Sequence, residues 1–144
     1  MILPDVNILV YGFRSDLPQH PSSRAWLESV RSGPEPLGLA DAVLTSFLRL
    51  VTNRRVFADA ATISDALSFT SALRETPNCR NLVPSNATWE QFSAFASNDP
   101  YIVGNHVPDA WLAALAMSNG ARLATADAGF ARFKGLSWFN PLLA

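Results

Sequence analysis

The sequence predicts a single α/β domain, residues 1–144, built around a mainly parallel sheet. Its 144 residues are one domain's worth of chain, long enough to bury a substantial core. Hydrophobic residues make up 49% of the composition and charged residues 16%, which indicates a compact globular protein. Short apolar runs also alternate with longer stretches of helical spacing, and this is the pattern of strands joined by helices.

Six segments carry the signals of helices. Pro21 and the serines after it suit a helix start, and Ser32-Gly33 suits the end of that helix. Thr62 or Ser64 can cap a later helix, and Asn119-Gly120 suits the end of the last one. That last segment is apolar almost all round, so we expect it to be buried. The expected helices are residues 6–13, 20–33, 41–52, 62–75, 88–96 and 108–118.

Five short apolar runs between these helices predict strands. Pro34 and Pro36 force a break in the chain before the second run. The expected strands are residues 1–4, 37–40, 80–83, 122–124 and 136–139. Because helical segments separate most of them, the strands are expected to pair mainly in parallel.

Charge and cysteine content narrow the range of functions. Eleven Lys and Arg against 12 Asp and Glu give a formal net charge of −1, so nucleic acid would need a local basic patch or metal bridges. The single cysteine, Cys79, excludes an internal disulfide and a cysteine-based zinc site. There is no run of about 18 apolar residues for a membrane span, and no basic-then-apolar start typical of a secretory signal. We therefore expect a cytoplasmic protein that makes no membrane contact.

Four aspartates lie at the ends of predicted strands or the starts of predicted helices: Asp5, Asp41, Asp109 and Asp127. In open α/β folds, ligands bind at the carboxyl ends of the strands, where the connections diverge. Taken alone, each aspartate is explained by a role in capping a helix or a turn at least as well as by a role in binding a ligand. Gathered together, they would repel one another unless a cation neutralised them, and Mg²⁺ prefers such oxygen ligands. The pattern predicts a divalent-metal site and metal-assisted hydrolysis of a phosphate ester.

Four stretches of sequence lie in order along nearly the whole chain: PDVNILVY at 4–11, FLRLVTN at 47–53, GNHVPDAWLAALA at 104–116 and ATADAGFARF at 124–133. Together they resemble the PIN-domain family, and within it the VapC-like toxins of bacterial toxin–antitoxin pairs. The resemblance implies a Rossmann-like three-layer α/β/α sandwich. It also implies an endoribonuclease that hydrolyses RNA phosphodiester bonds with Mg²⁺ or Mn²⁺, a cognate antitoxin protein, and a homodimer.

The sequence departs from that family pattern at two acidic positions. Ser46 stands where many relatives carry a glutamate, and Gly129 stands where a second aspartate often follows Asp127. The predicted catalytic and metal-ligating residues are Asp5, Asp109 and Asp127, with Asp41 as a further candidate ligand. Three carboxylates suffice for one Mg²⁺ that keeps several waters, so the predicted mechanism uses mainly one ion.

Several polar residues are candidates for support of this site. Asn7 and Thr125 lie two residues from predicted ligands, and each either orients a carboxylate or serves as a turn or cap residue. Arg49 follows Ser46 by three residues and is the preferred contact for a substrate phosphate, although a solvated arginine is the plain alternative. The candidates for a local basic track along RNA are Arg54, Arg55, Arg132 and Lys134.

The role of one apolar segment and the function as a whole each leave alternatives open. The segment Phe57–Phe69 has apolar residues at helical spacing, which fits core packing, a dimer interface or an antitoxin groove. His20 and His106 have no matched partner in the sequence, and we assign catalysis to neither. Because of Ser46 and Gly129, the alternative function is a degenerate PIN-like module that acts by binding RNA or protein.

Overall fold

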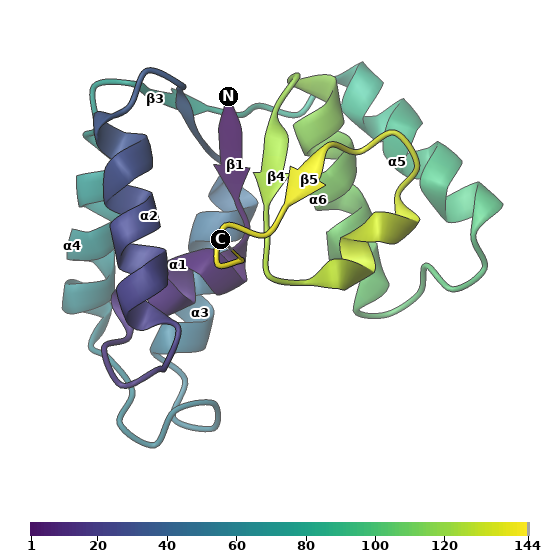
Figure 1. Ribbon diagram of the computed structural model, residues 1–144. Helices are drawn as coiled ribbons and strands as arrows, with labels where there is room; N and C mark the ends of the chain where they lie inside the picture. Colours follow the sequence, from purple (N-terminus) through teal and green to yellow (C-terminus); the bar gives the residue numbers. More distant parts are fainter. Residues whose placement is uncertain (144) are drawn as a thin grey trace.

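The computed structural model describes residues 1–143 and contains a five-stranded sheet in which every pairing is parallel. The strands are β1 (Ile2–Pro4), β2 (Leu37–Leu39), β3 (Cys79–Asn81), β4 (Arg122–Ala124) and β5 (Trp138–Phe139). Their order across the sheet is β3-β2-β1-β4-β5, with β1 in the centre (Figure 1). The predicted parallel sheet is confirmed.

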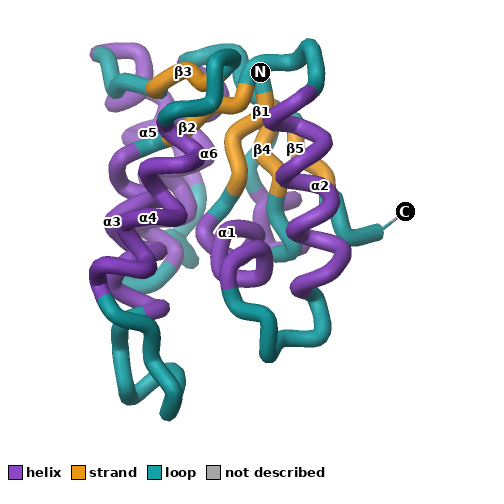
Figure 2. Tube along the Cα trace, turned by 90° about the vertical axis from the view of Figure 1, so that its left-hand side faces the viewer, coloured by secondary structure: helices purple, strands orange, loops and turns teal. Residues whose placement is uncertain are grey.

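Helices cover both faces of the sheet. They are α1 (Val6–Phe13), α2 (His20–Ser32), α3 (Asp41–Val51), α4 (Ile63–Arg74), α5 (Asn86–Asn98) and α6 (His106–Ser118), with a short 3₁₀ helix η1 (Ala128–Arg132). Figure 2 shows α2 over one face and α3 to α6 over the opposite face. The predicted three-layer α/β/α sandwich is therefore confirmed. None of the helices within residues 1–143 combines the length and apolarity that crossing a bilayer requires.

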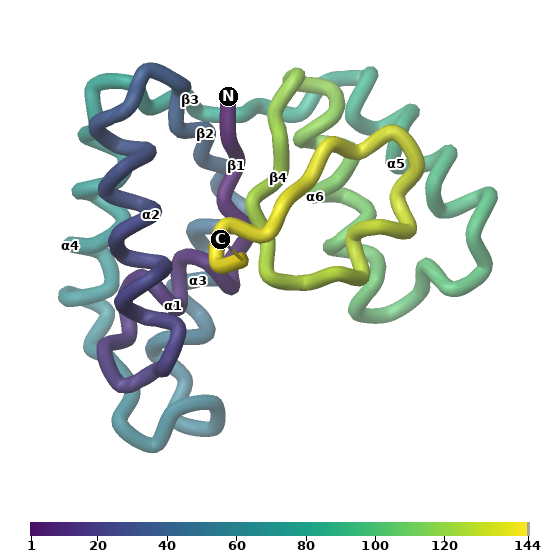
Figure 3. The backbone as a smooth tube through the Cα atoms, in the orientation of Figure 1, coloured from purple at the N-terminus to yellow at the C-terminus, as the bar shows by residue number. Residues whose placement is uncertain are grey.

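The chain reverses its direction of travel across the sheet once. From β1 it moves outward through β2 to β3, and it then returns past β1 to form β4 and β5 (Figure 3). β1 and β4 are therefore neighbours whose following segments move apart. In an open α/β sheet this is the place where a crevice forms at the carboxyl ends of the strands.

Local signals in the sequence fix several helix ends. The Asp5 side chain accepts a hydrogen bond from the Val6 N–H at the start of α1, and the Thr62 side chain accepts one from the Asp65 N–H at the start of α4. After α6, Gly120 adopts a φ of +64°, a left-handed conformation that glycine reaches without a steric penalty. The predicted cap at Thr62 and the predicted end at Asn119-Gly120 are confirmed.

The core lies between the sheet and the helices on each side. Leu3, Leu37 and Leu123 on the three central strands are fully buried, as expected of parallel strands covered on both faces. Helix α6 buries the run Ala113–Ala116, three alanines and Leu115, which confirms the prediction of a buried helix.

The structure corrects several predicted boundaries. Helix α5 begins at Asn86 and not at Thr88, because the Ser85 N–H donates to the Thr88 hydroxyl and so caps the helix earlier. Strand β3 begins at Cys79 and ends at Asn81, and only Trp138 and Phe139 of the expected last strand pair with the sheet. The 3₁₀ helix after Asp127 was not predicted.

Candidate active site

The candidate site lies where β1 and β4 end side by side. The Asp5 backbone N–H donates to the Ala124 carbonyl at 2.8 Å, so the residues that follow the two strands meet directly. Asp5 follows β1, and Thr125 follows β4. The parallel register of these strands thus joins two polar residues that are 120 positions apart in the sequence.

The Asp5 carboxylate is buried and held on both oxygens. Its side chain is only 5% exposed. One oxygen, Oδ1, accepts from the Val6 N–H at 2.7 Å, while Oδ2 accepts from the Thr125 hydroxyl at 2.6 Å and from the Asn7 amide at 3.1 Å. These contacts fix the orientation of the carboxylate.

Thr125 and Asn7 also tie the β4 loop to the start of α1. The Thr125 hydroxyl accepts from the Asp127 backbone N–H at 3.0 Å, and the side-chain Oδ1 of Asn7 accepts from the Ala126 backbone N–H at 3.2 Å. The position of the Asp127 backbone therefore depends on the same hydroxyl that orients Asp5. The structure brings Asp5, Asn7 and Thr125 together as a hydrogen-bonded group.

Asp127 is exposed beside this group. Its Oδ1 accepts from the Gly129 N–H at 2.8 Å and so caps η1. A Cβ atom at position 129 would lie 2.9 Å from that same oxygen. The glycine that departs from the family pattern thus leaves room for the Asp127 carboxylate to turn over the start of η1.

Electrostatics place Asp5, Asp109 and Asp127 in one neighbourhood. Burial raises the pKa of Asp5, and the charges of Asp109 and Asp127 raise it further, against the lowering effect of the hydrogen bonds from Thr125 and Val6. Burial and the charge of Asp127 also raise the pKa of Asp109, while His106 and Arg132 lower it. The charge of Asp127 therefore disfavours the ionised forms of both Asp5 and Asp109.

A pocket of about 120 Å³ lies between the N-terminal ends of α1, α3 and α6. Asp5 and Asp109 both line it, with Ser46 and Trp111 among the other lining residues. Within residues 1–143, no three His, Cys, Asp or Glu side chains converge closely enough to form a ready-made metal site. The donor set still suits a hard divalent cation, because it consists of oxygen ligands whose mutual repulsion a cation would relieve.

Two of the predicted residues lie away from this pocket. Asp41 is the first residue of α3, and its side chain is 75% exposed and forms an ion pair with Arg74 at 3.4 Å. The neighbouring residues Ala42 and Val43 line the pocket instead. Arg49 is exposed one turn beyond Ser46 and does not line the pocket. Asp41 is therefore not placed to act as a ligand in this pocket, and the phosphate role of Arg49 stays a prediction.

Trp111 and His106 lie near the carboxylates but were not assigned to the site from the sequence, whereas Arg132 was predicted only as part of a basic track along RNA. Trp111 lines the pocket. His106 and Arg132 lie close enough to Asp109 to lower its pKa. The spacing of His106, three residues before Asp109 on the same helix, could have indicated this proximity.

Comparison with known proteins identifies the family. A family model described as PIN domain matches residues 2–136. Ribonuclease VapC43 of Mycobacterium tuberculosis is 45% identical over 142 residues, which cover 99% of this chain and 96% of that protein. The chain belongs to the PIN-domain family, among the VapC ribonucleases. Ribonuclease VapC25 of the same organism is 32% identical over 148 residues, with 98% of this chain and 99% of that protein covered.

Solved structures support the same fold for this VapC family member. A chain in the crystal structure of VapBC2 from Rickettsia felis, bound to a DNA fragment from their promoter, has a TM-score of 0.71 at 19% identity. It covers 97% of this chain and 98% of that one. The crystal structure of VapC20 from M. tuberculosis, described as a toxin that cleaves the sarcin-ricin loop, has a TM-score of 0.65 at 14% identity. It covers 91% of this chain and 93% of that one. The PIN fold is thus retained at low sequence identity.

Proposed function

We propose that this chain is the toxin of a toxin–antitoxin pair and hydrolyses RNA phosphodiester bonds with a divalent ion, Mg²⁺ or Mn²⁺. Asp5, Asp109 and Asp127 would hold the ion. One observation carries this proposal: two acids 104 positions apart line one pocket, and a third acid beside it raises the pKa of both. Near-complete alignment at 45% identity with a protein named a ribonuclease supports cleavage over the alternative of a degenerate binding module.

The chain's own residues prepare the carboxylates for this task. Thr125 and Asn7 hold Asp5 in one orientation, as groups behind a metal ligand do. Through the Asp127 N–H, the same threonine fixes the loop that carries the third acid. When bound, the ion would acidify a water and stabilise charge on the phosphate. Because Ser46 and Gly129 supply no carboxylate, the residues present favour one ion that keeps several waters.

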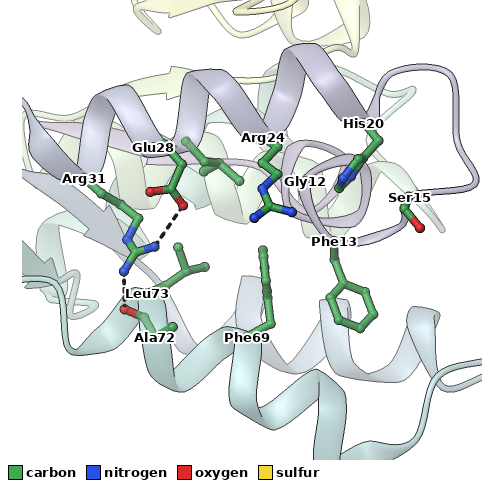
Figure 4. A pocket seen from close by; sticks show the side chains of 11 residues that line it. Gly12, Phe13, Ser15, His20, Arg24, Glu28, Arg31, Phe69, Ala72 and Leu73 are labelled. Carbon is green, nitrogen blue, oxygen red and sulfur yellow. Dashed lines mark hydrogen bonds and ion pairs between the residues drawn. The ribbon is translucent and has the colours of Figure 1, made fainter.

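A different pocket suits the antitoxin. It has a volume of about 380 Å³ and lies between α2 and α4 (Figure 4). Phe69 and Leu73 of α4 form an apolar wall, and Arg24 of α2 extends toward the gap above Phe69. Arg31 already donates hydrogen bonds to the Glu28 carboxylate and to the Ala72 carbonyl. An antitoxin helix with apolar anchors and an acidic residue facing Arg24 would fit this groove. Phe69 belongs to the segment Phe57–Phe69, for which an antitoxin groove was one of the interpretations from the sequence.

Cleavage of single-stranded RNA by the purified chain, freed of any antitoxin, tests the proposal. Wild type should cut RNA with Mg²⁺ or Mn²⁺ and stop when EDTA is added. Asp127→Asn should lose about 10²-fold or more in rate, because charge stabilisation at a reacting phosphate is a large part of catalysis. Asp41→Asn is the matched control, since it removes an acid from a first helical turn outside the pocket. Cleavage that persists in EDTA, or equal losses in both variants, would overturn the proposal.

A further inference from the structure

A third pocket opens between α5 and the segment at the end of η1. Its volume is about 460 Å³, within the range of small-ligand sites. Phe95, Asn98, Arg132 and Lys134 line it, together with Gln91 and Phe133. Nothing in the cleavage chemistry proposed above requires these residues, so the pocket calls for an explanation of its own.

The position of this pocket links it to the reacting phosphate. Helix η1 begins directly after Asp127 and ends at Arg132. Because a 3₁₀ helix rises about 2 Å per residue, Arg132 lies on the order of 10 Å along η1 from Asp127. One side chain therefore belongs both to the wall of the pocket and to the surroundings of the catalytic acids.

The chemistry of the lining matches the parts of a nucleotide. Phe95 is half-buried and packs on Phe133, with ring centroids 5.1 Å apart, and so presents an aromatic group on which a base can stack. Asn98 and Gln91 carry amides that can donate to and accept from base edges.

The cations of the pocket are available to a phosphate. Within residues 1–143, neither Arg132 nor Lys134 forms an ion pair, and both are exposed. The one acid of the lining, Asp99, already accepts a hydrogen bond from the Tyr101 N–H at 2.9 Å. Two cations thus face one engaged carboxylate, which favours an anionic ligand.

We propose that this pocket binds a nucleotide of the RNA strand next to the cleaved bond, with its base against Phe95 and its phosphate between Arg132 and Lys134. The proposal rests on the RNA cleavage proposed above and adds a place where the sequence of the RNA can be read. Single-stranded bases are recognised in this way, by stacking and by contacts to their exposed edges. An antitoxin segment in the same pocket is the competing occupant that the experiment must exclude.

Lysine labelling tests occupancy without any need for catalysis, because Lys134 is the only lysine in the sequence. The wild-type chain is acylated in EDTA with and without a bound single-stranded RNA oligonucleotide, and each labelled peptide is quantified by mass spectrometry. RNA should slow acylation of Lys134 several-fold. The Met1 amine is the internal control, since it pairs with Glu35 at the opposite end of β1. The proposal would be overturned if RNA bound without protecting Lys134, or if purified antitoxin protected Lys134 and RNA did not.

Kinetics separate failure of this proposal from failure of the proposed function. Phe95→Leu should raise the KM for RNA about tenfold, since stacking contributes roughly 1–3 kcal/mol per base. Its rate on a small aromatic phosphodiester without a neighbouring nucleotide should stay unchanged. If Phe95→Leu folds poorly, Lys134→Gln at an exposed position provides a second test of the pocket. Arg80→Gln, which removes an exposed cation from the edge strand β3, is the matched control for Lys134→Gln. Wild-type cleavage with an unchanged KM in both pocket variants would reject the pocket alone. No cleavage by wild type would reject the nuclease.

Discussion

The Thr125 hydroxyl makes three contacts at once. It donates to Asp5 and accepts from the Asp127 backbone N–H and from the Asn7 amide. Its side chain is fully buried, so the hydroxyl itself cannot turn to water instead. A single hydroxyl therefore couples the orientation of one acid to the position of another.

Thr125→Val keeps the shape of this side chain and removes the hydroxyl. We expect a loss of about 2 kcal/mol in the free energy of unfolding, typical of a hydrogen bond to a charged group, together with a large loss of nuclease rate. Thr70→Val is the matched control, because Thr70 is also buried but its hydroxyl contacts only the Leu67 carbonyl. Chemical denaturation and RNA cleavage measure both effects. Equal losses of activity in the two variants would remove the special role of Thr125.

The raised pKa of Asp109 predicts an opposition between stability and activity. An acid whose pKa is raised by folding holds its proton more tightly in the folded state, so its ionised form destabilises the fold above that folded pKa. The cost disappears as pH falls through the folded pKa toward the ordinary value of 3.8.

Asp109→Asn should therefore raise the melting temperature at neutral pH in EDTA, with a gain that shrinks as the pH approaches 3.8. The same variant should lose nuclease activity. Melting curves across this pH range test the expectation, with Asp41→Asn as the exposed control. A variant less stable than wild type at pH 7, or a gain that does not depend on pH, would contradict it.

These residues also show how far the sequence predicts a site. Asp5, Asn7 and Thr125 were recognisable because they follow apolar strands closely, and the structure joins them in one hydrogen-bonded group. Asp41 satisfied the same pattern, yet its side chain points to Arg74. Position after a strand does not determine which way the first side chain of a helix points.

The loop between α3 and α4 is held by one buried cation. Arg14, just beyond α1, forms a two-bond pair with Asp16, donates to the Asp59 carbonyl at 2.7 Å and lies 4.1 Å from the centre of the Phe57 ring. This guanidinium thus connects the end of α1 to a long loop, which lies on the side of the sheet toward which the β1 arrow points (Figure 1).

Arg14→Lys should loosen that loop, because an ammonium group cannot reproduce a planar two-bond contact and a stacked ring together. We expect trypsin to cut at the exposed Arg54 and Arg55 several-fold faster than in wild type. Arg80→Lys makes the same chemical change on an exposed side chain and should leave the rate unchanged. An unaltered cleavage pattern in Arg14→Lys would show that other contacts hold the loop.

Four of the six α-helices, α1 to α4, were predicted to within one residue of their observed bounds. Helix α1 has the expected bounds, and α2 and α4 lie within one residue of theirs. The helix η1 was missed because its capping contact, from the Gly129 N–H to Asp127, forms within a short turn without a repeating apolar pattern. Helix α5 was predicted two residues late because the Ser85–Thr88 capping contact was not recognised.

The spatial order of the strands could not be predicted from the residues alone. The sequence indicates alternating strands and helices, but the placement of β4 against β1 follows from long-range pairing, with Leu3 opposite Leu123. That pairing creates the crevice and gathers the acids. The pocket beside η1 was equally hidden, because Phe95 and Arg132 come from segments that meet only in the folded chain.

Self-association of the chain stays a prediction that follows from the family resemblance. Several large apolar side chains are exposed and available for it, among them Trp89 at 61% and Tyr101 at 74%. Sedimentation of the purified chain at several concentrations would measure the oligomeric state. A monomer at all concentrations would rule out the expected homodimer.

The shared ion is tested most directly by titrating Mn²⁺ into the chain in a calorimeter at neutral pH. Wild type and Asp41→Asn should bind the ion alike. Asp109→Asn should bind it at least about tenfold more weakly, because one of three oxygen donors is lost. Binding of equal strength by wild type and Asp109→Asn, or an equal loss in Asp41→Asn, would show that the carboxylates of the crevice do not hold a common ion.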